Sequence, residues 1–454
     1  MLVIRRIWEP MLMGRQLIVW LALGTLTGIL VGVVATYFLK LLFWSIGHTA
    51  HWPFWMVAIA LPLGGLATGV LIHYFAPTAA GHGTEAVIRA VHRESGAIDW
   101  KVAPIKAIAT ITTIAPGGSA GKEGPSAQIG AAVASFLADV LKFSSEQRQK
   151  IVICGIGAGF AVVFGTPVAG AILGIEVLAI GDLWYDMLLP SFASSVIAYE
   201  VAKFLGLTWY YPGTSVAVPF TLGLFGKLLL LSVAAGLVAY LFVLLLDGLH
   251  QLMHKLLTER HWWMPVFPLI SGSALAVLML LAGRQYGGLS LLLLSQALSG
   301  HAVPALAFAW KLVMVAITLG LGMSGGIITP LFVIGATFGS MAAGFLHLPP
   351  AVGAELGMVA VTASGANVPI ALVVMGMELF GARLAPEFLI VAIPAFIVIG
   401  NHSVYPSQRV RLQKSPFVPI PQGRALEESE QGPLPLPWTR TKPDQKSKKT
   451  RGAV

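Results

Sequence analysis

The chain has 454 residues, of which 56% are hydrophobic and only 11% are charged, and its mean hydropathy is +0.80. Soluble domains carry about 25% charged residues, so this composition excludes a water-soluble globular protein. The formal net charge is +9, and the single cysteine, Cys154, excludes an internal disulfide. We therefore expect an all-α polytopic membrane protein.

Long apolar runs approach or exceed the roughly 20 residues that an α-helix needs to cross a bilayer. They are Leu17–Gly47, Trp55–Ile72, Thr221–Leu246 and Met264–Gly283. Other apolar runs are short or interrupted by glycine and proline, namely Lys101–Pro116, Val168–Ile180 and Val368–Phe380. Broken helices are tolerated in a membrane where they line an enclosed cavity, so these runs indicate a transport path.

Both ends of the chain are basic. Arg5, Arg6 and Arg15 precede the first run, and residues 405–454 contain ten Lys and Arg against four Asp and Glu. Positive charge marks the cytoplasmic side, so we expect both termini to be cytoplasmic, with the tail near anionic lipid rather than bound to nucleic acid. The expected units are a terminus (1–14), a membrane domain (15–405) and a mostly disordered tail (406–454).

Residues 117–130 read GGSAGKEGPSAQIG and look at first like a phosphate loop. Such a loop needs a glycine five positions before Gly-Lys and a hydroxyl residue after it, but Pro116 and Glu123 hold these positions. The glycines followed by Pro125 instead predict a helix start, which carries free N–H donors and attracts anions. Glu123 is itself an anion there. From the motif alone it is either a gate that competes with a solute anion or a simple helix cap.

The motif recurs later in the chain. Residues 119–135 match residues 324–340 at an offset of 205, and PVAGAILGIE (167–176) resembles PIALVVMGME (369–378) at an offset of 202. We therefore expect two related repeats, 15–215 and 218–405, of tilted and broken helices in inverted orientation. Ile327 and Ile328 stand where the first repeat has Lys122 and Glu123. Both halves therefore share the helix start, but only the first half has charged residues there.

These residues resemble the CLC family of chloride channels and proton-coupled chloride transporters. GKEGP resembles its gating-glutamate motif, GGIITP its second anion loop, and GNHSVYPS places Tyr405 at its pore tyrosine. The resemblance covers residues 15 to about 410. It implies a homodimer with one pore per subunit in the plasma (inner) membrane of a bacterium, with no cofactor and no enzymatic activity. The anion contacts that it implies are His82, Gly83, Lys122, Glu123, Gly124, Ile327, Ile328 and Tyr405.

The chain departs from the family pattern at three positions. His82 in GHGTEAV replaces a serine of the first anion loop, which opens the question of selectivity, and Ile328 replaces a phenylalanine. Val177 stands where antiporters have an internal proton-transfer glutamate. Its neighbour Glu176 is matched by Glu378 in the other repeat, which favours a structural role over proton transfer. The large C-terminal nucleotide-binding pair of eukaryotic members is not found, as expected for a compact prokaryotic protein.

The sequence therefore predicts transport of chloride or a similar small anion through a pore gated by Glu123. Val177 favours a passive channel, and the alternative is a proton-coupled antiporter that uses another internal route. A more distant alternative is a cation-coupled solute carrier, which shares the repeat plan. An intramembrane enzyme would need a nucleophile–base pair or a metal cluster, and we find neither in the sequence. His82 and Glu85 could form a metal-binding pair on a helix, but no further ligands accompany them at a suitable spacing.

Overall fold

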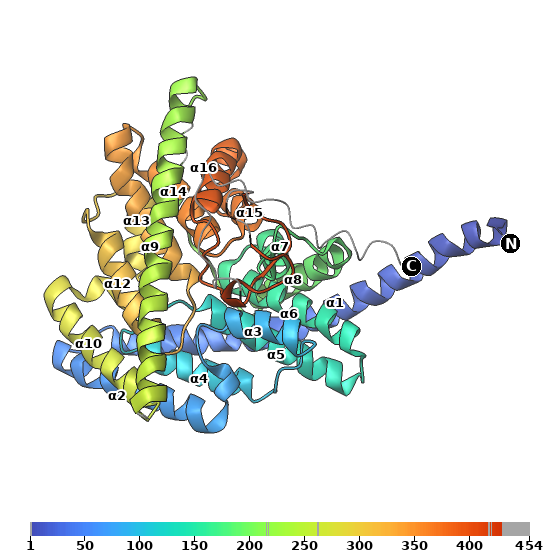
Figure 1. Cartoon of the computed structure of the whole chain (residues 1–454), viewed down its shortest axis with the longest axis horizontal. Coiled ribbons are helices and arrows are strands. Elements are labelled where there is room, and N and C mark those ends of the chain that lie inside the picture. The colour runs from blue at the N-terminus through green and yellow to red at the C-terminus, as the bar shows by residue number, and fades with distance from the viewer. Residues whose placement is uncertain are drawn as a thin grey trace, which may run out of the picture.

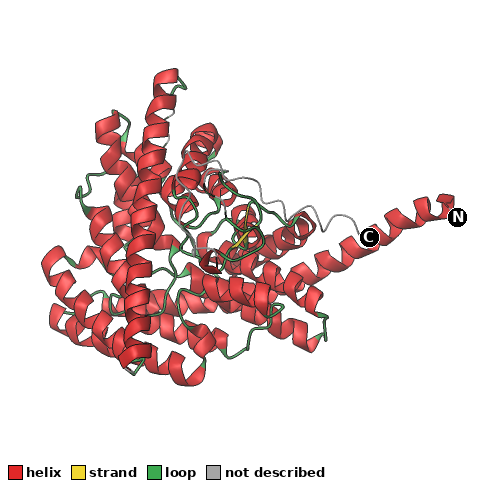
Figure 2. Cartoon of the chain, viewed as in Figure 1, coloured by secondary structure: helices red, strands yellow, loops and turns green. Residues whose placement is uncertain are grey.

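The computed structural model describes residues 2–214, 216, 218–260, 263–415, 418 and 420–428. Helices make up nearly all the regular structure in this part of the chain (Figure 2), which confirms the predicted all-α fold. The first half contains α1 (Leu2–Thr49), α2 (Phe54–Phe75), α3 (Thr84–Arg93), α4 (Val102–Ile114), α5 (Glu123–Val140), α6 (Ser145–Phe164), α7 (Pro167–Glu176) and α8 (Tyr185–Phe204). The second half contains α9 (Leu222–Arg260), α10 (Val266–Ala282), α11 (Leu291–Leu298), α12 (Ala307–Gly320), α13 (Ile328–Leu346), α14 (Pro350–Gly365), α15 (Pro369–Phe380) and α16 (Ala385–Val398).

Short elements complete the fold. The strands β1 (Ala179–Ile180) and β2 (Arg409–Val410) pair in parallel. The 3-10 turns are η1 (Pro77–Ala79), η2 (Arg284–Tyr286), η3 (Ala382–Leu384) and η4 (Leu426–Glu428).

The predicted apolar runs all form helices. The four long runs lie in α1, α2, α9 and α10, whereas the broken runs give the short helices α4, α7 and α15. Pro167 and Pro369 occupy the first position of α7 and α15, where a missing N–H costs nothing. Among the described residues four helices, α1, α2, α9 and α13, are long and apolar enough to cross a membrane, whereas α10 is shorter than that length.

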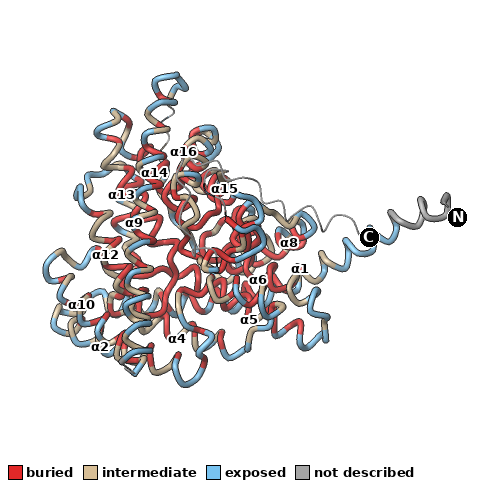
Figure 3. The backbone as a smooth tube through the Cα atoms, viewed as in Figure 1, coloured by how far each residue is buried: buried red, intermediate tan, exposed pale blue. Residues whose placement is uncertain are grey.

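The burial pattern is that of a protein in lipid. Leu281, Leu292 and Phe345 are exposed by 71%, 74% and 78% on the outer surface. Conversely every residue of α14 from Ala351 to Gly365 is buried. Figure 3 shows the buried residues gathered in the middle of the molecule, with exposed segments around them. An apolar perimeter around a buried centre fits an integral membrane protein, since lipid rather than water is its solvent.

The two halves repeat the same packing. In the first half α5 packs on α6 and α1 on α8; in the second half α13 packs on α14 and α9 on α16, which are the helices eight places later. Equivalent helices also meet across the halves, since α2 packs on α10 and α7 on α15. The long helix α9 crosses the whole view in Figure 1, while α1 extends away from the body toward the N-terminus.

A two-fold relation between the halves is visible in single hydrogen bonds. Gly121 and Gly326, which the offset of 205 makes equivalent, form an antiparallel bridge with N···O distances of 2.7 and 2.6 Å. The Ser119 N–H donates to the Thr318 hydroxyl and the Ser324 N–H donates to the Thr113 hydroxyl, again with the roles exchanged. Because equivalent residues pair antiparallel, the two loops run in opposite directions, as inverted repeats require.

The helical and folded segments extend beyond two of the predicted boundaries. α1 already begins at Leu2, inside the segment 1–14 that we expected to precede the membrane domain. At the other end the folded part continues past Tyr405, where we expected the tail to begin. Gln408 is buried and its amide donates to the carbonyls of Val177 and Ala366, both at 3.0 Å, next to the β1–β2 pair. The remaining tail, residues 429–454, lies outside the described residues.

Candidate functional site

The gating candidate Glu123 is the first residue of α5 and is completely buried. Its carboxylate does not cap its own helix. One oxygen accepts a 3.0 Å hydrogen bond from the backbone N–H of Thr329, and the other accepts one from the Thr329 hydroxyl. Thr329 is the second residue of α13, so a carboxylate from the first repeat occupies the helix start of the second repeat. A helix start stabilises negative charge through its free N–H groups and dipole.

Glycine lets the two repeats approach closely enough for this contact. A Cβ atom on Gly121 would lie 2.2 Å from a carboxylate oxygen of Glu123 and 2.8 Å from the ring of Pro330. Such separations are shorter than any van der Waals contact. The Gly121–Gly326 bridge and the Glu123–Thr329 contact therefore form one compact junction.

A third helix start meets this junction. Gly83 precedes α3 with a φ of +87°, and a Cβ on it would lie 2.4 Å from the carbonyl oxygen of Gly124. Likewise a Cβ on Gly124 would lie 1.8 Å from the carbonyl oxygen of His82. The predicted residues His82, Gly83, Glu123 and Gly124 are thus brought together, and the starts of α3, α5 and α13 converge on one place.

The side chains of His82 and Tyr405 face each other on one side of this junction. Their ring centroids are 5.8 Å apart, and their exposed fractions are 4% and 1%. His82 Nδ1 and the Tyr405 hydroxyl are both buried without a hydrogen-bond partner among the described residues. A buried polar group without a hydrogen-bond partner costs about 1–3 kcal/mol. Such groups are therefore expected where a ligand or a water molecule supplies the missing partner.

The loop that carries Tyr405 is fixed by α3. Glu85 accepts a 3.1 Å hydrogen bond from the Ser407 N–H and a second bond from the Ser407 hydroxyl. Glu85, three residues after His82, therefore positions the tyrosine loop.

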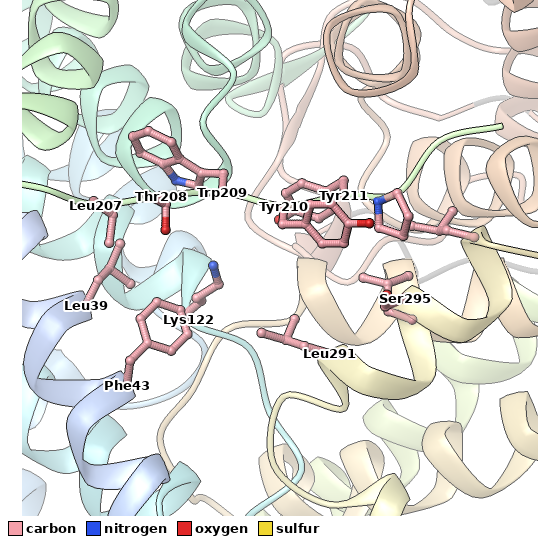
Figure 4. Close-up of a pocket in the computed structure, with 13 residues that line it drawn as sticks. Leu39, Phe43, Lys122, Leu207, Thr208, Trp209, Tyr210, Tyr211, Leu291 and Ser295 are labelled. Carbon is pink, nitrogen blue, oxygen red and sulfur yellow. The ribbon is translucent and has the colours of Figure 1, made fainter. Parts of the chain in front are cut away.

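Lys122 lies beside Glu123 but does not form an ion pair with it within the described ranges. Its ammonium donates to the Val163 carbonyl at 3.0 Å and lies 5.2 Å from the centroid of the Phe43 ring. It also lines a cavity of about 90 Å³ under the segment that joins α8 to α9. Figure 4 shows the Lys122 nitrogen pointing toward Thr208 and Trp209 of that segment, with Tyr211 nearby. This arrangement provides positive potential near the junction.

Ile327 and Ile328 are almost completely buried at the start of α13. Ile327 is the N-cap position and Ile328 the first helical residue, so their N–H groups are among those a helix leaves unpaired. Both predicted residues border the Glu123 junction, but the groups that donate to the carboxylate in this structure belong to Thr329. Sequence reasoning missed Thr329, although a hydroxyl residue directly before Pro330 is a signal for a donor at a helix start.

Glu176 and Glu378 belong to a different arrangement. Glu176 accepts hydrogen bonds from the N–H groups of Ile370 and Ala371 at 3.0 and 2.7 Å. Glu378 accepts from Val168 and Ala169 at the same two distances.

Each glutamate therefore caps the helix start of the other repeat, α15 or α7. This reciprocity supports the predicted structural role of Glu176. Val177, whose carbonyl accepts from Gln408, provides no titratable group.

Two buried lysines were not predicted. The Lys106 ammonium donates to the carbonyls of Ala79 and Gly81, in the loop before α3. The Lys311 ammonium donates to the Gly288 carbonyl and the Ser290 hydroxyl, both at 2.9 Å, in the loop before α11. Both lysines are completely buried and are separated by the repeat offset of 205. The sequence could have revealed this pair, because each lysine lies in an apolar run and the two are one repeat offset apart.

The geometry favours a small anion as ligand. Three helix starts converge, the unpaired His82 Nδ1 and Tyr405 hydroxyl lie beside them, and one carboxylate already sits on the α13 start. An anion of similar size can take the place of that carboxylate.

Comparison with known proteins agrees with this chemistry. Residues 64–400 match the family model described as voltage gated chloride channel. A Pseudomonas syringae pv. tomato protein named "Chloride/fluoride channel protein" is 34% identical over 426 residues, which cover 91% of each chain. The Vibrio cholerae serotype O1 "H(+)/Cl(-) exchange transporter ClcA" is 26% identical, covering 85% of this chain and 88% of the relative.

Solved structures give the same fold. The structure described as "a CLC-type fluoride/proton antiporter" superposes with a TM-score of 0.81 at 29% identity, covering 87% of this chain and 98% of that chain. A slow cyanobacterial Cl-/H+ antiporter superposes with a TM-score of 0.75 at 20% identity, covering 84% and 94%. The second likeness concerns the fold alone.

Proposed function

The chain belongs to the voltage gated chloride channel (CLC) family, and on that premise we propose that it exchanges chloride or fluoride for protons, with Glu123 as gate and proton acceptor. The observation that carries the proposal is the position of the Glu123 carboxylate on the start of α13. In this position it blocks the path and imitates the anion. An anion passes only when the carboxylate leaves.

Proton coupling follows from the same competition. Two negative charges in one buried place repel strongly, because the low local dielectric screens them poorly. A passing anion therefore displaces Glu123 more readily when the carboxyl group carries a proton. Binding linkage is reciprocal, so the anion also favours protonation of Glu123. Each cycle of the gate then moves a proton against an anion.

Relatives support both anions. The names of the similar proteins mention chloride, fluoride and protons. At the site itself, the unpaired Tyr405 hydroxyl offers a hard, small donor, which suits either halide. Chloride and fluoride fluxes must therefore be measured in parallel.

The second candidate is a passive channel, which the sequence favoured because Val177 cannot carry a proton. The channel name of the 34% identical relative also supports it. Exchange then requires an internal proton route that does not use position 177.

We further propose a homodimer with one path per subunit in the bacterial inner membrane, with both termini cytoplasmic. The apolar perimeter supports the membrane location and the basic terminal segments support cytoplasmic termini, whereas the homodimer is what the family implies.

A gradient experiment tests the proposed mode. The purified chain is reconstituted in liposomes, a chloride or fluoride gradient is imposed, and an ion electrode and a pH electrode are read together. Exchange predicts proton movement against the proton gradient, driven by the anion. Anion current that reverses at the Nernst potential of the anion, without proton movement, would establish the channel instead.

A further inference from the structure

We propose that an imidazole pair, His82 and His250, is the internal proton-transfer route to Glu123 and takes over the role that Val177 cannot perform. This inference rests on the proposed exchange of anions for protons. His250 belongs to α9, far from His82 in the sequence, yet the two ring centroids are 6.4 Å apart. That separation leaves the ring nitrogens beyond direct hydrogen-bond distance, so the transfer runs through one water molecule.

Three other candidate carboxylates are already engaged. Glu176 is held by two N–H groups of α15, and Glu378 by two N–H groups of α7. Glu85 is held by Ser407. His82, by contrast, keeps a buried Nδ1 without a partner among the described residues. An imidazole with one free nitrogen is suited to receive a proton there and to release one from the other nitrogen.

Exposure changes stepwise along the route. On α9, His254 is exposed, His250 is half-buried one turn earlier, and His82 is buried. Residues four apart on a helix lie on the same face, so His254 and His250 are neighbours. The His82 backbone lies at the Glu123 junction, since its carbonyl packs against Gly124, the residue after Glu123, and we place the last transfer between the His82 ring and the Glu123 carboxylate. The steps thus lead from the end of α9 to the gate.

The protons balance at each step. His250 Nε2 lies 3.3 Å from the Leu319 carbonyl, and since a carbonyl only accepts, Nε2 carries the hydrogen. His250 therefore accepts a proton on Nδ1 and becomes an imidazolium, and it releases that proton from Nδ1 through one water molecule to His82 Nδ1 while Nε2 keeps its hydrogen on the Leu319 carbonyl. His82 releases a proton from Nε2 toward the Glu123 carboxylate, which becomes a carboxylic acid. Rotation of the His82 ring restores its starting tautomer.

The charged groups around His82 favour release of a bound proton over its retention. Arg89 of α3, Lys106 of α4, His250 of α9 and the Tyr405 ring surround it, and no carboxylate is paired with its ring in the described part of the chain. On α9, Asp247 and His254 are the titratable neighbours of His250, and α12 presents the Leu319 carbonyl. The Arg89 guanidinium is always protonated and repels an imidazolium at His82, so a proton that arrives moves on.

The test compares His250→Gln with wild type in liposomes, with proton and anion fluxes measured separately. A positioned proton-transfer group contributes roughly 100-fold or more to the rate of transfer, so we expect proton flux to fall by about that factor while anion flux persists. His250→Glu restores a titratable group and should regain much of the proton flux. His92→Gln is the matched control, because His92 is also half-buried and also contacts a carbonyl through Nε2.

The outcomes separate this inference from the proposed function. An unchanged proton-to-anion ratio in His250→Gln would overturn the histidine route and leave exchange intact, as would equal losses in His92→Gln. Proton flux in His250→Glu as low as in His250→Gln, with both variants monodisperse, would also overturn it. A wild-type protein that moves anions without protons would overturn exchange and the route together.

Discussion

The Glu123 carboxylate, from the first repeat, accepts a 3.0 Å hydrogen bond from the backbone N–H of Thr329, in the second repeat. The Thr329 hydroxyl donates to the same carboxylate. Removing that hydroxyl in Thr329→Val weakens the hold on Glu123 and helps a competing anion. A hydrogen bond to a charged group contributes about 1.5–3 kcal/mol, so the anion should bind roughly tenfold tighter or more.

Calorimetric titration with chloride and fluoride measures this change. Thr329→Ser keeps the hydroxyl and serves as the control with near wild-type affinity. Equal or weaker anion binding in Thr329→Val would show that the hydroxyl does not help Glu123 to compete with the anion.

Gly83→Ala tests the convergence of helix starts. Its φ of +87° already disfavours a side chain, and the new Cβ would press on the Gly124 carbonyl at 2.4 Å. Gly81→Ala has a similar φ of +73° but nothing within 4 Å, so it carries the backbone strain of about 1–2 kcal/mol without the clash. We expect anion efflux to be lost in Gly83→Ala and largely kept in Gly81→Ala. Similar efflux from both variants would argue against close packing of α3 on α5.

Glu176 and Glu378 should behave alike because each caps the helix of the other repeat. Glu176→Gln and Glu378→Gln replace charged acceptors by neutral ones, which weakens two hydrogen bonds in each case. We expect both to lower thermal stability in detergent by similar amounts, on the order of 1–3 kcal/mol, with an unchanged proton-to-anion ratio. Loss of proton flux in Glu176→Gln alone would identify Glu176 as a proton carrier.

Lys122 should act through its potential rather than by pairing. In Lys122→Met the positive charge at the 90 Å³ cavity is gone, so anion flux should fall severalfold at low anion concentration and less at high concentration. Lys203, an exposed lysine on α8, provides the control Lys203→Met. A loss that is equal at all concentrations would point to damage to the fold instead.

The fold was largely predictable because its signals are local or periodic. Apolar runs located the long helices, Pro167 and Pro369 marked the starts of α7 and α15, and the offset of 205 made Gly121 equivalent to Gly326. The offset did not reveal that these two glycines pair with each other. Pairing depends on how the halves turn in space, and one sequence compared with itself does not contain that information.

The site was predictable in its members and not in its contacts. His82, Gly83, Glu123, Gly124 and Tyr405 do come together. The partner of Glu123 was missed because Thr329 lies one residue beyond the pair that the repeat alignment selected, and 206 residues from Glu123. The folded segment after Tyr405 was missed for a similar reason. Its basic, proline-rich composition indicated a disordered tail, but Gln408 is buried and bonds to Val177, which is far away in the sequence.

The central claim is that Glu123 and the transported anion compete for the start of α13. Its most direct test is the affinity of chloride and fluoride for wild type and Glu123→Gln, measured by calorimetry from neutral to acidic pH. The account predicts that wild-type affinity rises as the pH falls, because a protonated Glu123 releases the site, whereas Glu123→Gln binds tightly and independently of pH. The same pH dependence in both proteins, or weaker binding in Glu123→Gln at neutral pH, would contradict it.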